Sequence, residues 1–156
     1  MSRVPFYQVM SILISLLLLH LPLPTFLLWF RPDWVLLNII FWSTFSERAL
    51  PLWVIWALGM ALDVFYGTVL AVHSLGYLCV SFFGFFLKTR LTLYSPMHSL
   101  TFVTILVALN QIILSICLAT VSEQPIIFYW GPIPMTLIAW PIWGAQLQKL
   151  DLKLKK

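Results

Sequence analysis

The charged residues of this chain are spaced so widely that several long stretches contain none. Charge-free stretches run from Val4 to Phe30, from Val64 to Leu87 and from Leu91 to Ser122. About 20 mostly apolar residues in helical conformation cross the hydrocarbon core of a bilayer. Each of these stretches is therefore long enough to predict a membrane-spanning helix.

The composition also indicates lipid as the main solvent. Hydrophobic residues make up 62% of the chain and charged residues only 9%, whereas about 25% of the residues of a soluble domain are charged. The net charge of +4 comes from bases scattered over several short segments, so a stripe that binds nucleic acid is not predicted. We therefore predict an all-α integral membrane protein.

Six spans fit the sequence as one transmembrane bundle. They cover about 5–21, 30–46, 50–67, 70–87, 97–121 and 132–147, and a basic tail follows at 148–156. The second and third spans must include interfacial residues, because few residues separate Asp33 from Glu47 or Arg48 from Asp63. The alternative for this pair is a re-entrant hairpin that never crosses, and the alternative for the first span is a cleaved signal peptide.

The basic residues indicate the orientation of the six spans. Lys and Arg in short loops are retained on the cytoplasmic side of the inner membrane. With a cytoplasmic amino terminus, every base except Arg31 falls on that side, namely Arg3, Arg48, Lys88, Arg90, Lys149, Lys153, Lys155 and Lys156. We therefore expect both termini in the cytoplasm.

Asp63 is the charged residue that stands out within the predicted spans. A carboxylate at mid-bilayer costs roughly 2.5 to 3.5 kcal/mol on insertion scales and is usually functional or paired. Gly59, Asp63 and Gly67 are spaced four residues apart, so they share a helix face that a neighbouring backbone can approach. Asp63 either holds a partner helix or a small ligand, or it is an interfacial residue, hydrated or paired with Arg31 or His73.

The Arg-Pro-Asp segment at 31–33 places opposite charges on either side of a residue whose φ is fixed. This suits a rigid start to the second span, with Asp33 near the positive end of the helix dipole. The segment is either a plain cap with headgroup contacts or part of a periplasmic partner surface. Asn38, Asn110 and Gln111 lie within apolar spans, where we expect hydrogen bonds across helix interfaces.

Signatures of catalysis and of metal binding are missing from the sequence. It contains no H-E-x-x-H, no G-x-S-x-G and no Gly-rich phosphate loop. His20, His73 and His98 show no metal-ligand spacing, and Cys79 and Cys117 have no partner cysteine at redox spacing. We therefore expect no enzymatic activity, no cofactor and no metal site.

Three segments carry a more specific signal through their order and spacing. They are FRPDWVLL at 30–37, GMALDVFYG at 59–67 with the following 70–75, and WPIW at 140–143 before the basic tail. Together they resemble the rod shape-determining protein MreD family, from the second span to the carboxyl terminus. The chain departs from the family pattern at Ala71, where a glycine is common, and at His73, near which a basic residue is common.

The resemblance implies a non-enzymatic scaffold in the bacterial inner membrane that belongs to the cell-elongation machinery. It would dock MreC and work beside the MreB filament and the RodA and transpeptidase pair that extends peptidoglycan. The bundle would be similar to the substrate-binding subunits of energy-coupling-factor vitamin transporters. The residues expected at the docking side are Arg31, Asp33, Asp63, Gly59 and Gly67. Those expected to contact lipid or filament, or merely to anchor the tail, are Lys149, Lys153, Lys155 and Lys156.

Two other functions stay open. A small-molecule binding subunit of a transporter requires a ligand-sized cavity near the outer face, lined for instance by Asp63 with Asn110 or Gln111. A lipid-handling enzyme requires an acid, a base and an acceptor pocket at one depth, which the spacing of the five carboxylates does not supply.

Overall fold

The structure, a computed structural model, describes residues 6–19, 31–88, 96–118 and 130–154. The helices are α1 (Phe6–Leu19), α2 (Trp34–Ile40), the π-helical turn η2 (Phe41–Phe45), α3 (Leu52–Tyr66), α4 (Val72–Lys88), α5 (Pro96–Leu118) and α6 (Pro132–Leu154). Because η2 continues α2 directly, the described residues form six helical segments. This confirms the all-α prediction.

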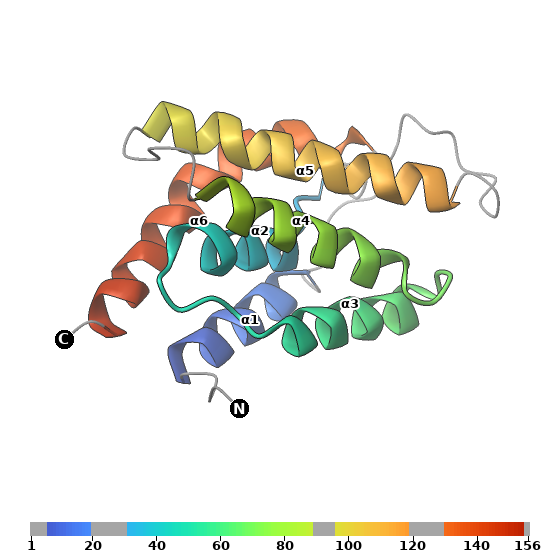
Figure 1. Cartoon of the computed structure of the whole chain (residues 1–156), viewed down its shortest axis with the longest axis horizontal. Helices are drawn as coiled ribbons and strands as arrows, with labels where there is room; N and C mark the ends of the chain where they lie inside the picture. The colour runs from blue at the N-terminus through green and yellow to red at the C-terminus, as the bar shows by residue number, and fades with distance from the viewer. Residues whose placement is uncertain (1–5, 20–30, 89–95, 119–129, 155–156) are drawn as a thin grey trace.

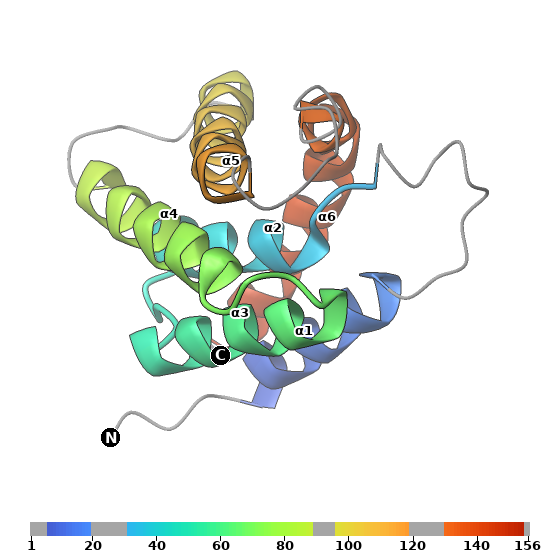
Figure 2. The same ribbon diagram turned by 90° about the vertical axis from the view of Figure 1, so that its right-hand side faces the viewer.

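The helix α2 lies at the centre of the bundle. In Figure 2, α5 lies on one side of α2, α1 and α3 lie on the other side, α4 flanks it, and α6 runs from beside α5 towards the side of α1. Every residue from Val35 to Ile40 is buried. A helix that is apolar all round belongs in the middle of a larger assembly, so the other helices form a shell around α2.

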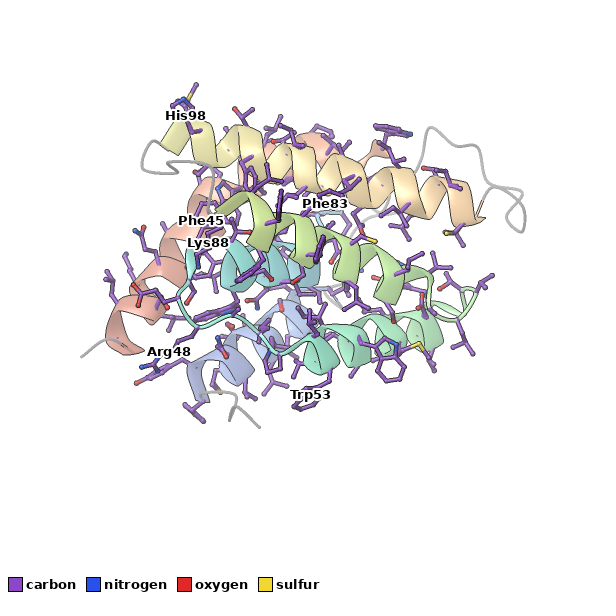
Figure 3. All side chains as sticks on the ribbon, viewed as in Figure 1. Phe45, Arg48, Trp53, Phe83, Lys88 and His98 are labelled. Atoms are coloured by element: carbon purple, nitrogen blue, oxygen red, sulfur yellow. The ribbon has the colours of Figure 1, made fainter. Side chains whose placement is uncertain are left out.

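The helices run alternately in opposite directions, as Figure 1 shows. The starts of α1, α3 and α5 therefore lie at the same end of the bundle as the ends of η2, α4 and α6. Figure 3 labels Arg48 and Lys88 at this end, together with His98 at the start of α5. We call it the basic end, and its described charged residues are Glu47, Arg48, Lys88, Lys149, Asp151 and Lys153. The opposite end, which we call the acidic end, carries Arg31, Asp33 and Asp63.

Only one described helix is both long and apolar enough to cross a bilayer unaided, namely residues Met97–Leu118 of α5. Four other apolar helices are shorter, and they are Phe6–Leu19, Trp34–Phe45, Leu52–Tyr66 and Val72–Lys88. The helix within the expected span 30–46 begins only at Trp34 because Asp33 caps it, its side chain accepting a hydrogen bond from the Leu36 N–H at 2.9 Å. Such a cap is worth about 1 kcal/mol.

The last helix extends further than the expected span 132–147. Instead of leaving the bundle, the segment predicted as a basic tail at 148–156 stays helical as far as Leu154. The reason is that the buried face of the helix continues beyond residue 147. Leu147 and Asp151 lie one turn apart on this face, and both are buried. Lys149 and Lys153 are exposed on this extension, and Lys155 and Lys156 lie outside the described residues.

The turn between α3 and α4 fixes where α3 stops. Gly67 adopts a left-handed conformation with φ of 62°. Its N–H donates to the Val64 carbonyl at 3.3 Å, and the Thr68 N–H donates to the Asp63 carbonyl at 3.1 Å, which is the Schellman pattern of a helix end. Ala71, four residues later, also has a positive φ of 75°, although this conformation favours glycine.

Replacing Ala71 by glycine should therefore stabilise the protein. A residue with a Cβ in the left-handed region is strained by roughly 1 to 2 kcal/mol, so we expect Ala71→Gly to raise the free energy of unfolding by about 1 kcal/mol. The matched control is Ala61→Gly on the exposed side of α3, where glycine should cost about 1 kcal/mol. Unfolding in detergent measures both, and a destabilised Ala71→Gly variant would contradict the strain.

Candidate functional site

Asp63, in the last turn of α3, is completely buried. Its Oδ1 atom accepts hydrogen bonds from the Thr68 hydroxyl at 3.0 Å, from the His73 backbone N–H at 3.1 Å and from His73 Nδ1 at 2.6 Å. Its Oδ2 atom has no hydrogen-bond partner among the described residues. Of the pairings considered from the sequence, the structure has the one with His73.

The imidazole of His73 is held on several sides. Its ring centroid lies 5.6 Å from that of Tyr66, at an interplanar angle of 32°, and 6.2 Å from that of Tyr77, at 74°. Offset and edge-to-face arrangements of this kind are favourable. The ring is therefore fixed by Asp63 at one edge and by two aromatic side chains.

Tyr77 connects this pair to the start of α2. Its ring is fully buried, and its hydroxyl donates to Asp33 Oδ2 at 2.6 Å. The other oxygen of Asp33 is the one that caps α2. Asp33 and Asp63 are thus linked through Tyr77 and His73, which lie one turn apart on α4. We call these four residues together with Thr68 the acidic-end cluster.

The cluster gathers residues that the sequence singled out separately. Arg31 precedes Asp33 by two residues and lies at the same end of the bundle. Sequence reasoning missed Thr68, Tyr66 and Tyr77. Tyr77 could have been found, because a tyrosine hydroxyl in an apolar helix needs a hydrogen-bond partner and Tyr77 follows His73 by one helical turn.

Gly59 within α3 and Gly67 directly after it, which were expected from the sequence to share one helix face, have different roles. A Cβ added to Gly59 would lie only 2.5 Å from the backbone nitrogen of Ser74, so α3 and α4 are in close contact there, as expected. A Cβ added to Gly67 would meet nothing within 4 Å. The expectation that Gly67 lets a neighbouring backbone approach is therefore wrong, because this residue is needed for its positive φ.

The amides inside the bundle were expected to hydrogen bond between helices. Asn38 does so, since its Nδ2 donates to Ser15 Oγ at 3.2 Å and its Oδ1 accepts from Ser11 Oγ at 3.3 Å. Asn110 is equally buried and lies against Gly76, but its amide atoms have no partner among the described residues. Gln111 is also buried. The expectation therefore holds for the contact between α1 and α2 and is wrong for Asn110.

A second polar junction, which the sequence did not reveal, lies at the basic end. The Ser46 hydroxyl donates to Asp151 Oδ1 at 2.6 Å, and the Ser46 carbonyl accepts from Lys88 Nζ. The Gln8 side chain donates to the Arg48 carbonyl at 2.6 Å. The loop after η2 is thus tied to α1, α4 and α6. An acidic residue within a basic tail was the only sequence signal for this junction.

Neither junction resembles a metal site. The part of the chain that the structure describes contains no group of three or more His, Cys, Asp or Glu side chains that could hold a metal ion. What the acidic-end cluster can do chemically is fix two helix ends relative to each other through hydrogen bonds to two carboxylates.

A comparison with known families identifies the type of protein. The model of the rod shape-determining protein MreD family matches residues 2–145. The chain belongs to the MreD family. The resemblance drawn from the sequence is thereby confirmed, and with it a role in rod-shape determination and an association with the elongation machinery. MreD is a non-catalytic shape-determining membrane protein.

No curated protein and no solved structure gives a match to this chain. The MreD match includes every residue of the acidic-end cluster, whereas Lys149 and Asp151 lie beyond its last residue. The part of the chain that is typical of MreD therefore contains the candidate site.

The hydrogen bond from Tyr77 to Asp33 should contribute measurably to stability. Hydrogen bonds to charged groups are worth about 1.5 to 3 kcal/mol, so we expect Tyr77→Phe to lower the free energy of unfolding by that amount. The matched control is Tyr66→Phe, because Tyr66 is 44% exposed and the loss of its hydroxyl should change little. Equal effects of the two substitutions on unfolding in detergent would refute the link.

Proposed function

We propose that this MreD protein is a scaffold that docks MreC at its acidic end and links it to the elongation synthase, RodA with its transpeptidase, and to the MreB filament. The observation that supports this most directly is the acidic-end cluster. It ties the start of α2 to the turn between α3 and α4 through Asp33, Tyr77, His73 and Asp63. A surface whose backbone is already fixed loses little entropy on binding, which suits a docking face.

The proposed topology has six helices crossing the inner membrane, with the basic end in the cytoplasm. The charges of the described residues support this orientation, because four bases and two acids lie at the basic end, and one base and two acids lie at the acidic end. Bases are retained on the cytoplasmic side. The acidic end then faces the periplasm.

The turn between α3 and α4 offers the contact surface. Val69 and Leu70 are 44% and 59% exposed, although they are apolar and lie outside any helix. Apolar side chains exposed beside polar groups are typical of protein interaction sites. Arg31 and Asp33 are partly exposed at the same end and would supply the polar rim.

The exposed lysines of α6 are proposed to contact anionic lipid or the cytoplasmic filament. Each base near an anionic membrane surface is worth about 1 kcal/mol. Lys149 and Lys153 project from a helix whose opposite face is held by Asp151 and Ser46. Lys155 and Lys156 continue the same basic sequence.

The alternative is a small-molecule binding subunit of a transporter, in a bundle like that of the energy-coupling-factor subunits. It was expected to use Asp63 together with Asn110 or Gln111. Asp63 Oδ1 already receives three hydrogen bonds from Thr68 and His73. Because a ligand would have to displace these donors or use Oδ2 alone, we favour the scaffold.

The topology predicts where reporter enzymes are active. Alkaline phosphatase folds only outside the cytoplasm, so its fusion after Val69 should be active and its fusion after Lys156 inactive. A fluorescent protein that folds only in the cytoplasm should give the opposite result at the same two positions. An active phosphatase at the carboxyl end would reverse the proposed orientation.

The docking surface is tested by introducing one charge at either end of the bundle. Leu70→Glu at the acidic end should reduce the recovery of MreC in co-purification by at least about tenfold, equivalent to 1.4 kcal/mol, because a carboxylate would be buried in the interface. Leu152→Glu is the matched control at the basic end, since Leu70 and Leu152 are 59% and 56% exposed, and it should leave MreC recovery unchanged.

The same preparation distinguishes the two functions. Undiminished recovery of MreC with Leu70→Glu would show that the docking surface does not include this turn. A vitamin retained by the purified wild-type chain, together with no MreC at all, would favour the transporter subunit instead.

A further inference from the structure

The helix α3 is too short for an ordinary bilayer, and both of its ends are fixed. It runs from Leu52 to Tyr66, which is 15 residues, between the extended Pro51 and the left-handed Gly67. At 1.5 Å per residue this is about 22 Å, whereas the hydrocarbon core of a bilayer is about 30 Å thick. Neither end can be extended without removing the residue that terminates the helix.

Exposed aromatic residues lie near both ends of α3, on the outer side of the bundle. Trp53 and Trp56 near its start are 60% and 50% exposed, and Phe65 and Tyr66 at its end are 59% and 44% exposed. Figure 3 shows Trp53 at the edge of the bundle. Trp and Tyr side chains prefer the two membrane interfaces. Along the axis these two pairs are only about 14 to 20 Å apart, counting from the residue rise.

The helix on the opposite side of the bundle is longer than α3. There, the mostly apolar stretch Met97–Leu118 of α5 is 22 residues long, which corresponds to about 33 Å. Figures 1 and 2 both show α5 and α3 on opposite sides, with α4 between them. Exposed Ile105 and Ile112 face outward from α5. One face of the bundle therefore fits a normal bilayer, and the other is shorter by about a third.

We propose that the α3 face is surrounded by a locally thinned bilayer, so that this protein contacts lipid of two thicknesses on its two sides. A bilayer thins to match a short apolar segment, and the aromatic pairs of α3 would hold the interfaces at the reduced spacing. The proposal rests on the crossing of α3 in the topology above and is independent of MreC docking. The partner of the α3 face is thus bilayer lipid with shortened or disordered chains.

Nitroxide labels test the depth of lipid on each side. The full chain carries Cys79→Ala and Cys117→Ala, with a single label at Ala61→Cys or Ile105→Cys, positions that are exposed near the middle of α3 and α5. Accessibility to oxygen and to a water-soluble nickel complex gives the depth in phosphatidylcholine vesicles with 18-carbon chains. We expect the Ala61 label to lie several ångströms shallower than the Ile105 label.

The outcomes separate this proposal from the topology on which it rests. Equal depths at both positions would overturn thinning but leave the crossing of α3 intact. A label at Ala61 that nickel reaches as freely as in water would overturn both. A label shielded from oxygen and nickel alike would show that a partner helix or a second copy covers α3, which also overturns the proposal.

Varying the chain length gives a second, independent readout. As acyl chains lengthen from 16 to 20 carbons, the Ile105 label should become deeper while the Ala61 label stays at nearly constant depth. Removing the anchors with Trp53→Leu and Trp56→Leu should make the Ala61 label follow chain length as well. Phe82→Leu with Phe83→Leu on α4, where both rings are also exposed, is the matched control and should leave the Ala61 label unchanged.

Discussion

The burial of α2 on every side is the constraint on which the rest of the structure depends. Because lipid provides little driving force for apolar helices to associate, packing around α2 alone does not specify where each helix stops or in which register it lies. Polar contacts at the two ends supply that information. At the acidic end Tyr77 holds Asp33, and at the basic end Ser46 holds Lys88 and Asp151. The central helix is thus clamped at both ends by α4, which contributes a side chain to each junction.

The two junctions also differ in the segments that they connect. The acidic end is made of neighbouring segments, the start of α2 and the hairpin of α3 and α4. The basic end instead connects segments far apart in sequence, since Ser46 and Asp151 are 105 residues apart. The carboxyl-terminal helix is therefore joined to the loop before α3, and α3 extends from that loop to Asp63 in its last turn. Side-chain contacts and helix therefore connect the basic end to the acidic end without a break.

The sequence predicted the all-helical class, the alternation of the spans and the segregation of charge, because these follow from the spacing of charged residues in a chain that must avoid burying them in lipid. It also predicted that Arg31, Asp33 and Asp63 would lie at one end. It could not predict that Tyr77 donates to Asp33 while His73 contacts Asp63, because the helical period does not tell which buried hydroxyl meets which acid. The predicted end of the last span, at residue 147, was wrong for a related reason. Four lysines suggested a solvated tail, whereas Asp151 lies in α6, is buried and accepts a hydrogen bond from Ser46.

The shortness of α3 and the acidic-end cluster have the same structural cause. The left-handed turn at Gly67 stops α3 and folds the chain back, so that Thr68 and His73 reach the carboxylate of Asp63. A longer α3 that matched an ordinary bilayer would replace this turn by helix and carry Thr68 away from Asp63, which would then be a buried carboxylate with fewer donors. Because an unsatisfied charge in lipid is more costly than a modest mismatch in thickness, the cluster fixes the carboxyl end of α3, as Pro51 fixes its start, and the bilayer is the component that must adapt.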